Sequence, residues 1–294
     1  MTRRPVVAPL GQQHPLRGRR RHLLMAILVV VLVLSAAAAL VPGSTAAFTV
    51  QVTNSTNTAK AANYFTCGAA IMANTPRVYY KLDEAAAATT ATDSSGQARN
   101  GTYQGTTTKG VADACDRDAG TAVTFNGSTG YVNLASSLSV PTSYSISAWF
   151  KTTSTTGGLI AGFGAAATGA STTVDRALYL TNTGALVFGN NNAAKTTAAT
   201  TTTYRDGNWH HVMATIGANG ARIYVDGTQA ATSTGTATAT YTGFFRVGYD
   251  NLTGWPNAPT SSFLAATLDE VAAYSTTLTA TDAVNHYTAG RAAT

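Results

Sequence analysis

The sequence predicts an all-β protein folded as a two-sheet antiparallel sandwich of the jelly-roll type. Past Ala47, short runs rich in β-branched and aromatic residues recur between clusters of Gly, Asn and Asp. The sequences TNTG, GANG and VDG supply hairpin turns, because Asn and Gly accept the positive φ of tight turns. A helical period of any length appears only near the end, in TATDAVNHYTAG. Many short strands joined by tight turns are typical of sandwiches and jelly rolls.

The expected strands follow one another along the chain and are RVYYKL, AVTFNG, YVNL, YSISAWFK, ALYL, ALVFG, HHVMATI, ARIYV, FFRVGY and ATLDEVAAYS. Two stretches rich in Thr and Ala, AAAATTATDSSG and KTTAATTTTY, offer few side chains that could pack in a core. We therefore expect them to form surface loops or sheet edges.

Residues 1–47 have the three parts of an export signal. A basic segment ending in RGRRRH precedes an apolar run from Leu23 to Leu40, and small residues follow at 44, 46 and 47. We expect a signal peptide and a secreted or cell-surface protein. A retained membrane-anchor helix is the alternative, because ~20 apolar residues can span a bilayer. Six of the 19 basic residues lie in this segment and the rest of the chain is neutral, so we expect no nucleic-acid partner.

The exported part contains two cysteines, Cys67 and Cys115. An even count in an oxidising compartment favours a disulfide, and the alternative is a pair of buried free thiols.

The sequence WHH, at residues 209–211, raises the question of a metal or catalytic site. Successive side chains of a strand point to opposite faces, so His210 shares a face with Val212, and His211 shares one with Trp209. Adjacent histidines on opposite faces do not easily bind one metal, and His286 lies far along the sequence. We therefore expect His210 to be a core-facing histidine with a hydrogen-bond partner.

Glycoside hydrolysis requires two carboxylates across a cleft, about 5 to 10 Å apart. The exported part has two glutamates, Glu84 and Glu270, and VAAY follows Asp269 and Glu270 without a second carboxylate at the alternate position. We expect no catalytic residues. The GxSxG, GxGxxG and P-loop motifs are also missing from the sequence, so nothing in it indicates a nucleophilic triad or a nucleotide site.

The motifs YYKLDE, DSSGQARNGTYQG, AVTFNGSTGYVNL, YSISAWFKT, DGNWHHVMAT, ARIYVDG and LDEVAAYSTTLT resemble, in this order, laminin G-like (concanavalin A-like lectin) domains of bacterial surface proteins. The resemblance covers residues 75–291 and leaves 48–74 as an N-terminal extension. That extension is similar, in its position after the signal, to the start of camelysin-type biofilm-fibre precursors. The resemblance implies a usually non-catalytic jelly roll that binds carbohydrate or protein ligands. It also implies a structural calcium held by Asp93, Asn100 and Asp269, and the alternative is that Asp93 caps a turn and Asp269 pairs with a cation.

Aromatic residues in loops are candidates for sugar contact, because a flat ring covers the apolar face of a pyranose. Trp255 stands between Gly254 and Pro256 in a long loop, after Tyr249 and Asn251. It is either a sugar contact or an anchor of the loop. Trp149 shares the polar face of its strand with Ser145, Ser147 and Lys151, which predicts an exposed sheet face.

The sequence thus predicts an exported binding or adhesion module whose partner is an extracellular glycan or a surface protein. A structural component of a matrix or fibre is the first alternative, and a glycoside hydrolase is the second.

Overall fold

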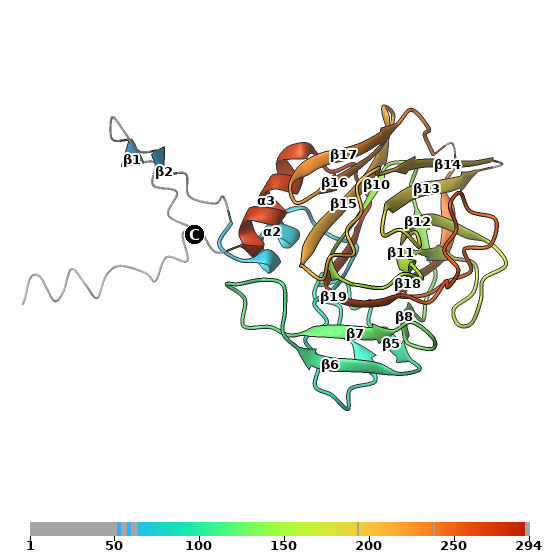
Figure 1. Ribbon diagram of the computed structural model, residues 1–294, viewed down its shortest axis with the longest axis horizontal. Coiled ribbons are helices and arrows are strands. Elements are labelled where there is room, and N and C mark those ends of the chain that lie inside the picture. The colour runs from blue at the N-terminus through green and yellow to red at the C-terminus, as the bar shows by residue number, and fades with distance from the viewer. Residues whose placement is uncertain (1–51, 54–57, 60–63, 193, 238, 292–294) are drawn as a thin grey trace, which may run out of the picture. The chain divides into compact units, whose positions relative to one another are not determined.

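Two antiparallel β-sheets stacked in a sandwich form the body of the computed structural model, which describes residues 52–53, 58–59 and 64–291 except 193 and 238 (Figure 1). The predicted signal segment, 1–47, and most of the 48–74 extension lie outside the described residues. Two short strands of that extension, β1 (Val52–Thr53) and β2 (Thr58–Ala59), pair with each other. No helix among the described residues has the length and apolar character needed to cross a membrane.

The first sheet has eight strands. In spatial order these are β17 (Thr228–Ser233), β16 (Gly220–Val225), β15 (His210–Gly217), β10 (Tyr144–Lys151), β19 (Ala265–Tyr274), β7 (Ala122–Asn126) and β6 (Thr107–Val111), while β3 (Val78–Tyr80) also pairs with β19. Every pairing is antiparallel. The register of β10 against β19 shifts between Ser147 and Trp149, so that Glu270 is an extra residue with a φ of 54° in β19.

The second sheet has nine strands. In spatial order these are β14 (Ala194–Ala199), β13 (Leu186–Asn192), β12 (Val174–Leu180), β11 (Gly158–Gly164), β18 (Tyr241–Val247), β8 (Tyr131–Leu134), β5 (Gly101–Gln104) and β4 (Thr90–Ala91), while β9 (Leu138–Val140) pairs with β18. The two Thr/Ala-rich stretches provide its edge strands, β4 and β14, which confirms the expectation that they form loops or edges.

The core lies between the two sheets and follows the alternation of the strands. On β10, Tyr144, Ile146, Ala148 and Phe150 point into this core and are at most 1% exposed. On β15, Val212, Ala214 and Ile216 do the same. The predicted division of these two strands into an inner and an outer face is confirmed.

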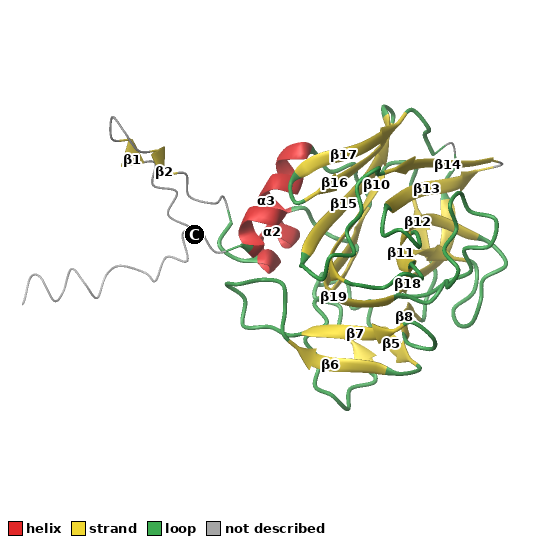
Figure 2. Ribbon diagram, in the orientation of Figure 1, coloured by secondary structure: helices red, strands yellow, loops and turns green. Residues whose placement is uncertain are grey.

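The outer face of the eight-stranded sheet is covered by two helices, α2 (Cys67–Ala73) and α3 (Ala280–Gly290) (Figure 2). Trp149 lies beneath them and is 1% exposed, with its ring 5.8 Å from that of Tyr287 on α3. The expectation that Trp149 lies on an exposed sheet face is therefore wrong, because segments from both ends of the described chain cover that face.

Side-chain caps fix the start of both helices. Thr279 accepts a hydrogen bond from the backbone of Asp282, whose carboxylate accepts one in return, which is a capping box at the start of α3. The periodicity of TATDAVNHYTAG predicts this helix. The short α2 was not expected, although Thr66 caps it by accepting from the backbone N–H of Ala69.

The disulfide between Cys67 and Cys115 ties α2 to the loop that precedes β7, with the two Cα atoms 6.2 Å apart. Gly68 on α2 donates its backbone N–H to Asp118 in the same loop. The predicted disulfide is confirmed, and we call α2, α3 and residues 112–120 the cap.

Candidate functional site

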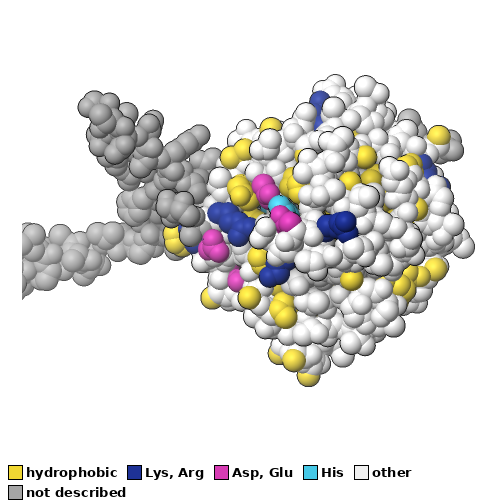
Figure 3. Space-filling view, viewed as in Figure 1, with side chains coloured by type: hydrophobic (Ala, Val, Ile, Leu, Met, Phe, Trp, Pro, Cys, Tyr) yellow, Lys and Arg dark blue, Asp and Glu magenta, His cyan; other side chains and the backbone are white. Residues whose placement is uncertain are grey.

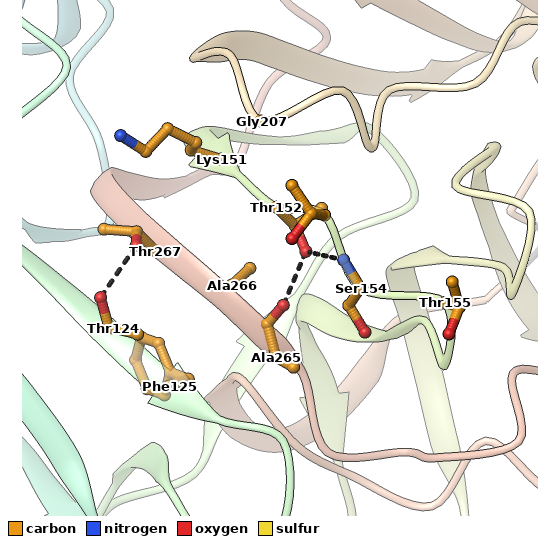
Figure 4. A pocket seen from close by; sticks show the side chains of 11 residues that line it. Thr124, Phe125, Lys151, Thr152, Ser154, Thr155, Gly207, Ala265, Ala266 and Thr267 are labelled. Carbon is orange, nitrogen blue, oxygen red and sulfur yellow. Dashed lines mark hydrogen bonds between the residues drawn. The ribbon is translucent and has the colours of Figure 1, made fainter.

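A groove of about 600 Å³ lies on the outer face of the eight-stranded sheet, lined by β7, β10, β19, the loop after β10 and Gly207 (Figure 4). Its lining residues are Thr124, Phe125, Lys151, Thr152, Thr153, Ser154, Thr155, Gly207, Ala265, Ala266 and Thr267. Six of these side chains carry a hydroxyl group and one carries a positive charge. The described residues that line the groove include no carboxylate.

The floor of the groove follows from the register of three neighbouring strands. Lys151 on β10 is opposite Thr267 on β19, and Thr267 is opposite Thr124 on β7. These three side chains lie on the same outer face as Trp149, two residues before Lys151 on β10. The hydroxyl groups of Thr124 and Thr267 are 2.8 Å apart and hydrogen-bonded (Figure 4).

The wall of the groove is the loop after β10, held in place by its own polar side chains. The hydroxyl of Thr152 donates to the carbonyl of Ala265 at 2.7 Å and accepts the backbone N–H of Ser154 at 3.0 Å (Figure 4). Gly207 closes the wall by donating its backbone N–H to the carbonyl of Thr152. Thr153 and Thr155 are exposed, so their hydroxyl groups are accessible to a ligand.

Lys151 is at one end of the groove, where the cap ends. Its ammonium nitrogen is 5.5 Å from the ring centre of the half-buried Trp209. Figure 3 shows a cluster of charged side chains around a histidine on one face, with further Lys or Arg side chains near the top and right edges. By its lining residues, the groove combines one cation with an uncharged, hydroxyl-rich surface.

The two histidines of WHH do point to opposite faces, as expected. The Nδ1 atom of His210 is 2.7 Å from Asp226 and its Nε2 atom 3.2 Å from Asp206. Burial alone would lower the pKa of His210, but these two carboxylates raise it above the ordinary value. The expected hydrogen-bond partner of His210 is thus confirmed. The contact with Asp206 connects β15 to the turn beside the groove.

His211 is buried beneath the cap, where His286 from α3 packs against it with ring centres 5.5 Å apart. The two residues that the sequence separates by 75 positions are therefore neighbours. Burial lowers the pKa of His211 well below the ordinary value and that of His286 to about 4. Both rings are consequently neutral in the folded protein at neutral pH, and both are buried in the packing beneath the cap.

Acidic side chains also gather beneath the cap. Asp269 is 1% exposed, and its Oδ2 atom accepts the backbone N–H of Ala114 at 2.9 Å. Its Oδ1 atom and Oδ2 of Asp113 have no hydrogen-bond partner among the described residues. Burial is the main cause that raises the pKa of both carboxyl groups, and for Asp269 the neighbouring Glu270 adds to it.

Glu270 is 4% exposed and accepts a hydrogen bond from the hydroxyl of Tyr79. Burial raises its pKa to about 8, although the hydrogen bond from Tyr79 acts in the opposite direction. Asp269 and Glu270 therefore lie beneath the cap rather than in the groove.

The three predicted calcium ligands differ in how many of their oxygen atoms already accept hydrogen bonds. Both carboxylate oxygens of Asp93 accept hydrogen bonds, from Tyr79, Ser95 and Arg99. The Oδ1 atom of Asn100 accepts the backbone N–H of Asp93. These contacts fit the turn-capping alternative for Asp93, and a calcium site at Asp93 and Asn100 stays a prediction. Asp269 keeps one oxygen without a hydrogen bond, so calcium binding at Asp269 stays a prediction.

The loop that contains Trp255 covers the outer face of the nine-stranded sheet. Trp255 is 4% exposed, and its ring packs edge-on against Tyr179 with ring centres 6.0 Å apart. This burial fits the loop-anchor alternative for Trp255, and a sugar contact by Trp255 stays a prediction. The side chain of Asn251 ties this loop to the loop between β11 and β12, because its amide donates to the carbonyl of Ser171.

Tyr249 is half-buried, and its ring stacks on Phe263 at 3.6 Å with the two planes 7° apart. Tyr131 packs against the same pair, with its ring centre 5.5 Å from that of Tyr249. The protein's own side chains therefore cover much of this ring, and a ligand contact by Tyr249 stays a prediction.

Comparison with known proteins agrees with this architecture. A family model described as the concanavalin A-like lectin/glucanases superfamily matches residues 126–283, more than half of the chain. The chain belongs to this superfamily. No curated protein matches the sequence.

Solved structures resemble this concanavalin A-like domain at low sequence identity, so they show the fold alone. Domain 4 of a GH43 extracellular arabinanase from Geobacillus stearothermophilus, in complex with arabinotriose, has a TM-score of 0.53 at 19% identity over 72% of this chain and 98% of its own. The sialidase of Trypanosoma rangeli has a TM-score of 0.50 at 15% identity over 71% of this chain and 32% of its own. The receptor-binding domain of botulinum neurotoxin type G has a TM-score of 0.53 at 12% identity over 72% of this chain and 51% of its own. Lectin-like and enzymatic proteins thus share the fold, and the fold does not decide between them.

Sequence reasoning did not find the groove of this concanavalin A-like domain. Its residues come from four segments of the chain. The sequence predicts the strands in these segments but not which strands pair with one another. One signal was present, because YSISAWFK places Lys151 at the end of the polar face of its strand.

Proposed function

We propose that the chain is a non-catalytic saccharide-binding module of the cell exterior and that it binds its ligand in the groove beside Lys151. The observation that carries the proposal is the lining of the groove, in which hydroxyl groups surround a space of about 600 Å³. Ligand sites commonly have volumes of about 300 to 1,000 Å³ and place a few polar groups to fix the ligand's orientation. The disulfide supports an extracellular location, since such bonds persist in oxidising compartments.

The chemistry of the groove suits a saccharide. A sugar offers alternating donors and acceptors, and the hydroxyl groups of Thr and Ser can serve as either. The half-buried Trp209 lies next to Lys151 and gives that end of the groove an aromatic surface. The arabinanase domain bound to arabinotriose supports the proposal only through its fold.

Binding is favoured over glycoside hydrolysis because of where the carboxylates lie. A hydrolase needs two carboxyl groups that reach the scissile bond. The described lining of the groove has none, while Asp269 and Glu270 are covered by the cap. Hydrolysis would therefore require the cap to move away from β19.

A glycan array with the full chain tests the proposal. The Thr124→Val/Thr267→Val variant removes two hydroxyl groups from the floor with little change in volume, and we expect it to lose binding. Thr228→Val is the matched control, since Thr228 is exposed on the edge strand β17 of the same sheet. If no saccharide binds, or if both variants bind like the unaltered chain, the groove is not the saccharide site. Binding to a surface protein alone would likewise overturn the proposal.

A further inference from the structure

We infer that the groove selects acidic saccharides, and that Lys151 is the residue that determines this specificity. The inference rests on the proposed function, because it names the class of saccharide for the same groove. The chemical feature in question is a carboxylate or a sulfate group on the sugar.

The position of Lys151 follows from the place where the cap ends. The three preceding outer-face residues of β10, Ser145, Ser147 and Trp149, are at most 1% exposed because the cap and the chain after β19 cover them. Lys151 is the next residue on that face, and it is partly exposed at the end of the groove. In Figure 4 its side chain lies on the side of Thr267, and Thr155 is at the opposite end. A ligand that extends along the floor therefore meets the ammonium group at one end.

The charge of Lys151 is not neutralised by the protein. The ion pairs among the described residues involve Arg176 and His210, and none involves Lys151. The nearby turn contains Asp206, whose carboxylate pairs with His210, with Oδ1 3.2 Å from Nε2, and not with Lys151. The contact between Lys151 and Trp209 holds the ammonium group without cancelling its charge.

An uncompensated cation at the end of an uncharged groove favours a ligand that brings an anion to that end. Hydrogen bonds between an ammonium group and a carboxylate or sulfate are shorter and stronger than those between neutral groups. A neutral sugar would leave this cation with only the Trp209 ring and water as partners. A hydrogen bond to a charged group contributes enough to change an affinity by about 10- to 100-fold.

The test compares trigalacturonate with trigalactose, which differ in the carboxylates, and adds a sulfated galactose trisaccharide. Their dissociation constants are measured for the full chain and for Lys151→Gln, Lys151→Arg and Lys195→Gln. Lys195 is the matched control because its ammonium nitrogen lies 5.9 Å from the ring centre of Trp255, a similar pair outside the groove. Circular dichroism confirms that each variant is folded.

We expect the unaltered chain to bind one or both acidic trisaccharides at least about 10-fold more tightly than trigalactose. Lys151→Gln should remove this preference, Lys151→Arg should keep most of it, and Lys195→Gln should leave it unchanged. A preference for the carboxylated or the sulfated probe identifies which anion fits. Equal affinity for acidic and neutral probes, or a preference that survives Lys151→Gln, overturns the inference while the saccharide-binding function stands. If no saccharide binds, the proposed function fails with it.

Discussion

The ammonium nitrogen of Lys151 lies 5.5 Å from the centre of the Trp209 indole ring, at the point where the cap meets the groove. The guanidinium of Arg291 donates to the backbone carbonyl of Trp209 at 2.8 Å. The C-terminal end of the described chain thus holds the backbone of Trp209, whose indole contacts Lys151 at the charged end of the groove. Lys151 also follows Trp149 on the outer face of β10, so the cap and the groove share one strand.

We predict that Trp209→Ala weakens the binding of an acidic saccharide by about 2- to 5-fold, because cation–π contacts at exposed sites contribute about 0.5 to 1 kcal/mol. Trp209→Phe should keep part of this effect, since its ring can still lie beneath the ammonium group. Titration calorimetry measures both variants. An unchanged affinity for Trp209→Ala would show that Lys151 does not depend on the indole.

Trp255→Ala should destabilise the protein by about 3 to 5 kcal/mol, as expected for truncation of a buried aromatic side chain. Saccharide affinity should not change, because Trp255 covers the other sheet. Denaturant unfolding and titration calorimetry measure the two effects, and Trp255→Phe should lose less stability. Weakened binding with unchanged stability would instead make Trp255 a ligand contact.

His286→Gln should reduce the loss of stability in acid. Burial lowers the pKa of His286 to about 4, so between pH 4 and about 6.5 the unfolded chain binds a proton that the folded protein does not. Stability therefore falls as the pH drops through this range, and His286 accounts for roughly 3 kcal/mol of that fall. Urea unfolding at pH 7 and at pH 4.5 measures how much the free energy of unfolding falls between the two pH values, for the unaltered protein and for His286→Gln.

His210→Gln should show the opposite pH dependence of stability in the same urea measurement. Burial lowers the pKa of His210, but Asp226 and Asp206 raise it above the ordinary value. The protonated ring therefore adds to the free energy of unfolding below the unfolded pKa, and this stabilisation is lost as the pH rises through the folded pKa. His210→Gln should therefore lose more stability at pH 4.5 than at pH 7. Equal pH profiles for the two variants would contradict the assignment of both histidines.

Removal of the disulfide by Cys67→Ser/Cys115→Ser should cost about 4 kcal/mol, the chain-entropy value for a loop of this length. Reduction of the unaltered protein should give a similar loss in thermal unfolding. The reducing agent should have no effect on the double variant. A double variant as stable as the parent would show that the other contacts of the cap hold it in place without the disulfide.

Calcium should raise the melting temperature of protein first stripped with EDTA, because a ligand that binds only the folded state stabilises it. Asp269→Asn should remove this gain, since the unpaired Oδ1 atom is the oxygen available to a cation. If calcium has no effect, Asp269 does not bind it and the carboxyl group has a structural role beneath the cap.

Local sequence patterns predicted the parts of the structure that depend on neighbours along the chain. The alternation in YSISAWFK placed Tyr144 and Phe150 in the core, and an even cysteine count predicted the disulfide. The burial of Trp149 could not be predicted in the same way, because the helices that cover it, α2 and α3, come from segments distant in sequence. Large outer-face residues such as Met213 and Tyr274 were the signal that this face is covered.

The groove required the register between strands, which no local pattern contains. Thr124 and Thr267 are 143 residues apart and meet only because β7 pairs with β19. Threonine is so common in this chain that neither residue stands out in the sequence. The aromatic residues that did stand out, Trp149 and Trp255, are both buried.

The central claim, that saccharides bind in the groove, is tested most directly by mapping amide chemical shifts of the 15N-labelled full chain during titration with a saccharide selected on the array. We predict that the largest shifts fall on residues 151–155, 207 and 265–267, which line the groove. Shifts that gather instead at Tyr249, Asn251 and Phe263, with none in the groove, would contradict the account.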